Sequence, residues 1–286
     1  QNKVDDWVLD TSTDSQTEFL VMLAEQADLS QAANLQTKEE KGAFVYQRLT
    51  ETAARAQKSL MQALADEARR DSSVQYRSYW VANMIWVRGD QALVEKLARR
   101  VDVAHLYANP AVKMQPPEPA AELNTPETPE AVEWNITKVQ APTVWAAGYT
   151  GQGAVVAGQD TGYDWDHPAL KNKYRGWDGA QADHDYSWHD AIHQDLSGDG
   201  SNPCGFDALV PCDDNSHGTH TMGTMVGDDG GSNQIGMAPG ARWIGCRNME
   251  SGVGRPETYA ECFQWFIAPT DLNNANPRTD LAAEVI

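Results

Sequence analysis

A glycine-rich helical segment is the feature that most restricts the fold of this chain. Residues 213–227 have the sequence Asp-Asp-Asn-Ser-His-Gly-Thr-His-Thr-Met-Gly-Thr-Met-Val-Gly. Asn215 or Ser216 is suited to cap a helix there, and His217 then falls in its first turn. Glycine destabilises a helix interior by roughly 1 kcal/mol relative to alanine. A helix with several glycines therefore indicates close approach to neighbouring backbone or to a substrate.

His217 is suited to proton transfer, because the ordinary pKa of histidine, about 6.5, lies near neutral pH. For a lone histidine a structural role is the alternative. A second motif, Ala154-Val-Val-Ala-Gly-Gln-Asp160-Thr-Gly, predicts a buried parallel strand. Asp160 would lie at its carboxyl end, where open α/β sheets place their sites. The alternative for Asp160 is a turn or cap residue.

The two motifs closely resemble the histidine and aspartate motifs of the subtilisin-like serine peptidases (S8 family), in that family's order. The long tryptophan-containing insert and the Cys-Arg-Asn-Met run at 246–249 resemble its bacillopeptidase F group. The resemblance implies that His217 is the general base of a Ser-His-Asp mechanism and that Asp160 orients it. It also implies a substrate-pairing edge at Gly252, Val253 and Gly254, for which an ordinary glycine turn is the alternative.

The nucleophile is missing from this pattern. The family's serine lies in a Gly-Thr-Ser-Met-Ala-like motif, and no such string occurs in the sequence. The motif of the oxyanion-hole asparagine is absent as well. We therefore expect both beyond Ile286, and we expect this polypeptide alone to be inactive as a peptidase.

The sequence pattern of the amino-terminal part predicts a separate α+β domain. Residues 18–23 form an apolar run typical of a buried strand, and residues 38–69 have helical spacing. The expected order is strand, helix, strand, strand, helix, strand, which is the ferredoxin-like pattern. In front of a subtilisin-like motif, this domain resembles the propeptide of that family, which assists folding and blocks the cleft. The further elements are expected at 74–80, 84–88, a short helix capped by Asp90, and 101–107.

These patterns divide the chain into a flexible tail (1–16), a propeptide domain (17–114), a Pro- and Glu-rich linker (115–133) and an incomplete catalytic domain (134–286). The predicted fold class is α/β: a ferredoxin-like α+β propeptide followed by a truncated subtilisin-like parallel-sheet domain. In the latter, strands are expected at 154–160, 241–248 and 281–286, and helices at 141–145 and 256–266.

Charge and composition exclude some partners. The formal net charge is −19, which argues against nucleic acid and anionic membranes. No apolar run approaches the roughly 20 residues of a membrane span. The family resemblance, more than the cysteines, predicts secretion, with polypeptide substrates and the chain's own propeptide as intramolecular inhibitor. Cys204 and Cys212 suit a local disulfide, whereas Cys246 and Cys262 are either paired or free thiols.

No cofactor is required by the expected mechanism, and no metal ligand is assigned. The family's usual calcium site is in doubt, because Ala169 stands where relatives have an acidic ligand. Asp195, Ser197 and Asp199 have the spacing of an EF-hand start, but Phe206 replaces the closing glutamate. A solvated acidic loop is favoured there over a calcium site.

The leading function is therefore a secreted serine endopeptidase made as a proenzyme. One alternative is an inhibitory or binding protein, in which a propeptide fold is fused to a catalytically dead remnant. Another is a metal-binding α/β protein that uses the histidine-rich insert at residues 181–203. For His217 itself, a zinc pair with His220 is the alternative. That pair lacks an acidic residue between the two imidazoles, and His220 is expected to pack inside.

Overall fold

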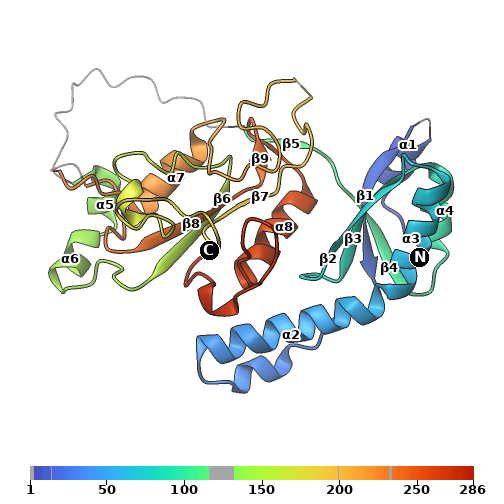
Figure 1. The fold of residues 1–286 in the computed structure, drawn as a ribbon, viewed down its shortest axis with the longest axis horizontal. Coiled ribbons are helices and arrows are strands. Elements are labelled where there is room, and N and C mark those ends of the chain that lie inside the picture. The colour runs from blue at the N-terminus through green and yellow to red at the C-terminus, as the bar shows by residue number, and fades with distance from the viewer. Residues whose placement is uncertain (1–2, 14, 116–131, 199, 232–233) are drawn as a thin grey trace. The chain divides into compact units, whose positions relative to one another are not determined.

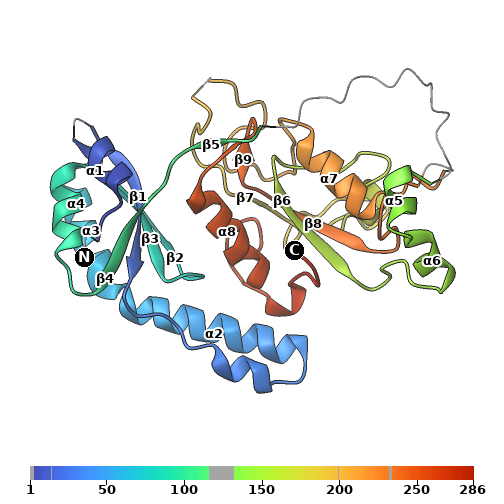
Figure 2. The same cartoon turned by 180° about the vertical axis from the view of Figure 1, so that it is seen from behind.

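The structure is a computed structural model that describes residues 3–13, 15–115, 132–198, 200–231 and 234–286. Its backbone divides into two compact units, one formed by residues 1–110 and 255–268, the other by residues 111–254 and 269–286. Figures 1 and 2 show the elements of each unit from opposite sides. Most of the predicted linker, residues 116–131, lies outside the described residues.

Unit 1 is built on a four-stranded sheet with the order β2-β3-β1-β4, in which all neighbouring strands are antiparallel. Its elements are α1 (Asp6–Ser12), β1 (Thr17–Leu23), η1 (Ser30–Asn34), α2 (Lys38–Ala56), α3 (Lys58–Arg70), β2 (Gln75–Tyr79), β3 (Met84–Gly89), α4 (Gln91–Ala98), β4 (Val103–Ala108) and α8 (Pro256–Ile267). These elements confirm the strands and the short helix after Asp90 that were predicted within residues 18–107, with small shifts at their ends.

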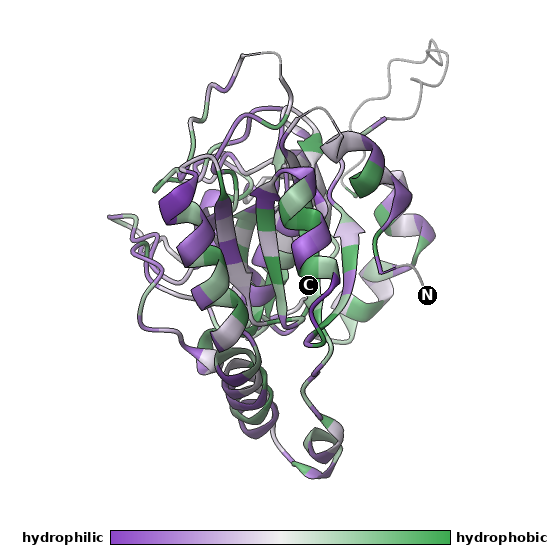
Figure 3. Ribbon diagram, turned by 90° about the vertical axis from the view of Figure 1, so that its right-hand side faces the viewer, coloured by the Kyte–Doolittle hydropathy of each residue, from purple (hydrophilic) through white to green (hydrophobic). Residues whose placement is uncertain are grey.

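The sheet of unit 1 has an apolar layer on each face. One layer joins strand residues such as Phe19 and Ile85 to Leu60 of α3 and Val94 of α4. The layer on the other face contains Leu20, Tyr79, Met84 and Trp86, against which Ala260 of α8 packs. Figure 3 shows the corresponding pattern, with hydrophobic segments along the strands and polar segments along the helices. Because successive strand residues point to opposite faces of the sheet, apolar residues cover both of its faces.

Two predictions for unit 1 were wrong in detail. Residues 6–12 form α1, and Val8 is fully buried in the core, so this part of the expected flexible tail is held by apolar burial. The helical stretch 38–69 is divided at Gln57. The buried amide of Gln57 donates to Asn83 Oδ1 at 3.0 Å and to the carbonyl of Tyr79 at 3.2 Å, which anchors the break to the sheet.

Unit 2 contains a three-stranded parallel sheet with the order β6-β8-β7. A second small sheet has the order β5-β10-β9. The elements are β5 (Val112–Lys113), α5 (Trp134–Lys138), α6 (Ala141–Ala146), β6 (Val155–Asp160), η2 (Lys171–Lys173), β7 (Trp188–Asp190), α7 (His217–Val226), β8 (Arg242–Arg247), β9 (Met249–Glu250), β10 (Val253–Gly254) and η3 (Thr279–Leu281).

The α/β class, the parallel sheet and the two strands predicted at 154–160 and 241–248 are confirmed. The strand expected at 281–286 is reduced to a single parallel bridge between Val156 and Val285. Aromatic rings pack beneath the sheet, with Tyr163, Tyr174, Trp188 and Trp243 all buried. This core fixes the carboxyl end of β6, at which Asp160 lies.

Candidate active site

Asp160 and His217, 57 residues apart in the sequence, meet in unit 2. Asp160 is the last residue of β6, and His217 is the first residue of α7. Nδ1 of the imidazole lies 2.7 Å from Oδ1 of Asp160. The Asp160 side chain is 12% exposed and that of His217 is 39% exposed. Asp160 is therefore shielded, while the imidazole is accessible to solvent and to a reacting group.

Further hydrogen bonds fix the carboxylate of Asp160. The backbone N–H of Thr161 donates to Oδ1 at 2.7 Å, and the hydroxyl of Thr221 lies 3.2 Å from Oδ2. The backbone carbonyl of Asp160 accepts from the N–H of Asn248 at 3.0 Å. Since both oxygens are engaged, the carboxylate has a defined orientation toward His217.

Two glycines allow the strand end and the helix start to approach each other. Gly162 has a φ of +111°, and a Cβ built there would lie 1.8 Å from the carbonyl oxygen of Cys212. A Cβ on Gly218 would lie 2.1 Å from the carbonyl oxygen of Gly162. The prediction of close backbone approach is confirmed at Gly218, at the start of the glycine-rich helix.

Replacing Gly218 by Ala is expected to push α7 away from β6, because the added methyl group meets rigid backbone rather than a flexible side chain. Overpacking of this kind costs about 1–3 kcal/mol. The Nδ1 proton of His217, observed by NMR, should lose its hydrogen-bonded shift. Gly223→Ala is the matched control, since its Cβ would have no contact closer than 3.6 Å. An unchanged His217 signal in Gly218→Ala would contradict the expectation.

Asp213, rather than Asn215 or Ser216, caps the start of α7. Ser216 occupies the N-cap position with a φ of 65° and makes no capping hydrogen bond through its side chain. Oδ1 of Asp213 accepts from the N–H groups of Asn215 and Ser216, and Oδ2 accepts from the N–H of Thr219 at 2.9 Å. A carboxylate placed before the helix satisfies its unpaired N–H groups and complements the helix dipole.

Asp213 also joins the helix start to the strand end. Its Oδ1 accepts from the hydroxyl of Thr161 at 2.8 Å, and the same hydroxyl accepts from the N–H of Gly218 at 3.0 Å. Thr161 follows Asp160 directly, and Gly218 follows His217 directly. Asp213, Thr161 and Thr221 were not assigned from the sequence. The sequence signal that could have identified them is their position inside the two motifs. Polar residues that lie beside a buried side chain need hydrogen-bonding partners.

His220 is exposed, so the prediction that it packs inside was wrong. It lies on the face of α7 that lines a cavity of about 980 Å³ together with Asp164, Trp165, His167, Ser216 and Thr219. Across the described ranges, no group of three metal-ligating side chains is found. His217 uses Nδ1 for Asp160, which is the arrangement of a base with its orienting carboxylate.

The segment at Gly252, Val253 and Gly254 forms an edge that is paired with another part of unit 2. Val253 and Gly254 make up β10, which lies antiparallel to β9 on one side and to β5, Val112–Lys113, on the other. The N–H of Met114 donates to the carbonyl of Gly252 at 2.7 Å. The backbone of β10 is therefore paired on both sides by strands of the same unit, as the middle strand of this small sheet.

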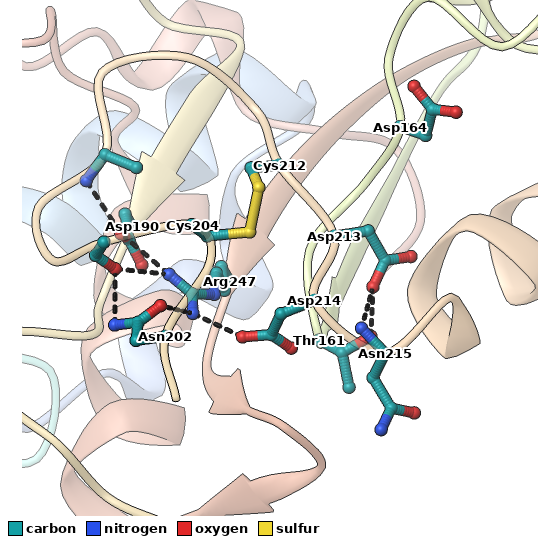
Figure 4. The surroundings of a disulfide bond; sticks show 12 residues. Thr161, Asp164, Asp190, Asn202, Cys204, Cys212, Asp213, Asp214, Asn215 and Arg247 are labelled. Atoms are coloured by element: carbon teal, nitrogen blue, oxygen red, sulfur yellow. Dashed lines mark hydrogen bonds and ion pairs between the residues drawn. A yellow bond between two sulfur atoms is a disulfide. The ribbon is translucent and has the colours of Figure 1, made fainter. Parts of the chain in front are cut away.

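The predicted disulfide between Cys204 and Cys212 is present. Cys246 and Cys262 are disulfide-bonded as well, and no described cysteine is free. The 204–212 bond closes the loop that leads into Asp213 (Figure 4). The carbonyl of Cys212 also accepts from the N–H of Tyr163 at 3.2 Å, so the disulfide supports the segment beside Asp160.

Converting Cys204 and Cys212 to Ser is expected to lower the free energy of unfolding by about 2–3 kcal/mol, the range for a loop of this length. Urea unfolding of the double variant and the parent chain, with the other cysteines intact, measures this difference. A reduced parent chain is not an adequate control, because Cys246 and Cys262 are also in disulfides. Equal unfolding midpoints would contradict a supporting role for this bond.

The expected calcium positions gain no support from the described side chains. Ala169 is buried, and a methyl group supplies no ligand oxygen. Asp195 accepts from the N–H of Gly198 at 2.7 Å and from the hydroxyl of Ser197, while Asp199 lies outside the described residues.

The pair formed by a shielded Asp160 and an accessible His217, at a strand end and a helix start, defines the class of this protein. Residues 151–278 match the profile of the Subtilase family (Peptidase_S8). The resemblance to subtilisin-like serine peptidases is thereby confirmed, and the chain belongs to the subtilase family.

The relatives are consistent with this assignment. Bacillopeptidase F of Bacillus subtilis (strain 168) is 34% identical over 260 residues, which is 87% of this chain and 17% of that protein. The major intracellular serine protease of the same organism is 31% identical over 143 residues, 49% of this chain and 35% of that protein. The chain thus spans well under half the length of these relatives.

A solved structure shares the fold. The epidermin leader peptide processing serine protease of Staphylococcus aureus, crystallised as an S393A mutant, aligns with a TM-score of 0.54. The alignment covers 88% of this chain and 48% of that one, at 12% identity. At this identity the comparison speaks for the fold alone.

Proposed function

We propose that this chain is the amino-terminal part of a serine endopeptidase proenzyme, with its nucleophilic serine and oxyanion-hole asparagine in sequence beyond Ile286. The observation that carries the proposal is the 2.7 Å contact between His217 Nδ1 and Asp160 Oδ1 in a chain of the subtilase family. Polypeptides are the substrates, and no cofactor is needed.

In this proposal each residue has a defined task. His217 Nε2 takes the proton of the serine hydroxyl as it attacks the peptide carbonyl, and then returns the proton to the leaving amine. Asp160 holds the imidazole in the tautomer with hydrogen on Nδ1 and stabilises the imidazolium that forms. Thr161 and Thr221 keep the carboxylate in this orientation. The edge at Gly252, Val253 and Gly254 binds the substrate backbone.

We further propose that residues 17–114 are an inhibitory propeptide of ferredoxin-like arrangement, followed by a linker at 115–133 and the catalytic part at 134–286. The sheet order β2-β3-β1-β4 with two connecting helical segments supports the arrangement. Pairing of Val112–Lys113 with β10 supports inhibition, because this pairing occupies the edge proposed to bind substrate. The clustering of α8 with the propeptide sheet supports a propeptide that holds an element of the catalytic part.

Secretion is part of the same proposal. It is supported by the disulfides, which persist in oxidising compartments. None of the helices in the described ranges has both the length and the apolar character required to cross a bilayer. The acidic chain, with a net charge of −19, is not expected to bind nucleic acid or anionic membranes.

The test begins with the coding sequence after Ile286, where an in-frame Gly-Thr-Ser motif is expected. The longer chain should be labelled by a serine-directed fluorophosphonate, and His217→Ala should abolish this labelling. His220→Ala is the matched control and should retain it. A stop codon directly after Ile286 would instead favour an inhibitory protein with an inactive remnant. Labelling that persists in His217→Ala would contradict the assigned base.

A further inference from the structure

A buried arginine joins the segment before α7, which contains Asp214, to the inserted loop of unit 2, residues 181–203. The side chain of Arg247, at the end of β8, is fully buried. Its Nη2 donates to Oδ2 of Asp214 at 2.5 Å and to Oδ1 of Asn202 at 3.0 Å, and its Nη1 donates to the carbonyl of Gly205 at 2.9 Å. Figure 4 shows this cluster beside the Cys204–Cys212 disulfide.

Asp214 connects the cluster to the edge proposed to bind substrate. Its side chain is fully buried, and its Oδ1 accepts from the backbone N–H of Ser251 at 2.9 Å. Ser251 has a φ of 49° and directly precedes Gly252. Because this conformation is unfavourable for a residue other than glycine, the turn needs an external partner to hold it. The carboxylate of Asp214 is that partner.

The inserted loop supports the same edge from another direction. Val253 packs against Ile192 and Leu196. The buried carboxylate of Glu250 accepts from the N–H of Leu196 at 2.5 Å and from the N–H of Ser197 at 3.1 Å. The edge is thus held on one side by apolar contacts with the insert and on the other by Asp214, which Arg247 fixes in place.

Asp213 and Asp214 are adjacent in sequence but serve different neighbours. The carboxylate of Asp213 accepts from Thr161 and from the first turn of α7, both beside the Asp160–His217 pair. The carboxylate of Asp214 accepts from Arg247 and from Ser251. Hydrogen bonds to charged groups are stronger than those between neutral groups. Removing either carboxylate should therefore have a local effect on its own set of partners.

We propose that Asp214, held by Arg247, is a positioning residue for the Gly252–Gly254 edge, acting through the Ser251 amide, while Asp213 positions the Asp160–His217 pair. The role given to the edge rests on the function proposed above. Because the two carboxylates hold different groups, substitution of Asp214 should disturb the Gly252–Gly254 edge alone. Substitution of Asp213 should disturb the Asp160–His217 pair alone. Neither aspartate contacts the reacting atoms in this assignment.

The test compares Asp213→Asn with Asp214→Asn in the 286-residue chain, using two readouts that need no peptide cleavage. Amide hydrogen exchange in a fragment covering residues 249–254 reports on the edge. The NMR signal of the His217 Nδ1 proton reports on the pair. Asp214→Asn is expected to accelerate exchange at the edge about tenfold or more, as for the loss of a hydrogen bond to a charged group, with an unchanged His217 signal. Asp213→Asn is expected to do the reverse.

A second variant covers the case in which Asp214→Asn weakens the buried charge cluster around Arg247 so far that the chain does not fold. Asp214→Leu combined with Arg247→Met and Asp190→Asn removes the three buried charges of the cluster, including the Asp190 carboxylate that lies 3.4 Å from Arg247 Nη1. Proteins often tolerate such a change, and it should give the same accelerated exchange. Unchanged exchange at residues 249–254 would overturn the proposal, as would a His217 signal altered as strongly as in Asp213→Asn. Failure of the longer chain to cleave peptides would instead overturn the proposed function and leave these readouts intact.

Discussion

Replacing Asp160 by Asn in the longer proenzyme is expected to lower kcat about 10⁴-fold, with a much smaller change in KM. The substituted side chain would keep the size of the original but could donate its amide hydrogens toward the imidazole. The tautomer with hydrogen on Nδ1 would lose its acceptor, and the imidazolium formed during attack would lose its counter-charge. Substrate binding at the Gly252–Gly254 edge does not depend on this carboxylate.

The measurement is hydrolysis of an unstructured peptide by the matured enzyme, with kcat and KM determined separately. Asp166→Asn is the matched control, since Asp166 is exposed in the loop after β6 and its carboxyl neighbours that of Asp164. It should leave kcat nearly unchanged. A large rise in KM with kcat intact would contradict the assigned role of Asp160, because it would identify a binding residue rather than an orienting one.

The sequence predicted the elements that are defined by local patterns. The apolar run ending at Asp160 became β6, and the glycine-rich stretch after Ser216 became α7. Asp90 caps α4 as expected, through the N–H of Leu93 at 2.9 Å. Each of these predictions depends on interactions between residues that are close together in the chain. Such local interactions can be recognised from a single sequence.

The contacts that were missed depend on residues far apart in the chain. The cap of α7 was assigned to neighbouring polar residues, whereas Asp213 takes that role because it also reaches Thr161, 52 residues earlier. His220 was expected to pack inside, and it is exposed. Arg247 gave no sequence signal for burial, because its partners Asn202 and Asp214 come from separate loops.

Unit 1 is expected to lose stability as the pH rises toward 7, because of Glu257. This residue follows the first residue of α8 and is 4% exposed. Burial, together with the nearby charge of Glu18, raises the pKa of its carboxyl to about 7, against the opposing effects of Arg255 and Asn109. Folding therefore favours the protonated form of Glu257.

The direction of the pH effect follows from this shift. Below the ordinary pKa of glutamate, about 4.3, Glu257 is protonated in both the folded and the unfolded chain, and its contribution is fully present. As the pH rises from about 4.3 to the folded value of about 7, the unfolded chain has released its proton while the folded chain still holds it, so stability falls over this range. The resulting loss of stability should level off at about 3 kcal/mol above pH 7.

Hydrogen exchange of the α8 amides, compared at pH 4.5 and pH 8 after correction for the intrinsic rate, measures this loss. Glu257→Gln should remove most of the pH dependence, because its neutral amide keeps the volume and the contacts of the protonated acid. Glu95→Gln, on the exposed side of α4, is the matched control and should retain it. If the parent chain and Glu257→Gln show the same pH dependence, another group is responsible. If they differ as expected, the contact between α8 and the sheet of unit 1 weakens at neutral to alkaline pH, because a buried carboxyl group must then release its proton.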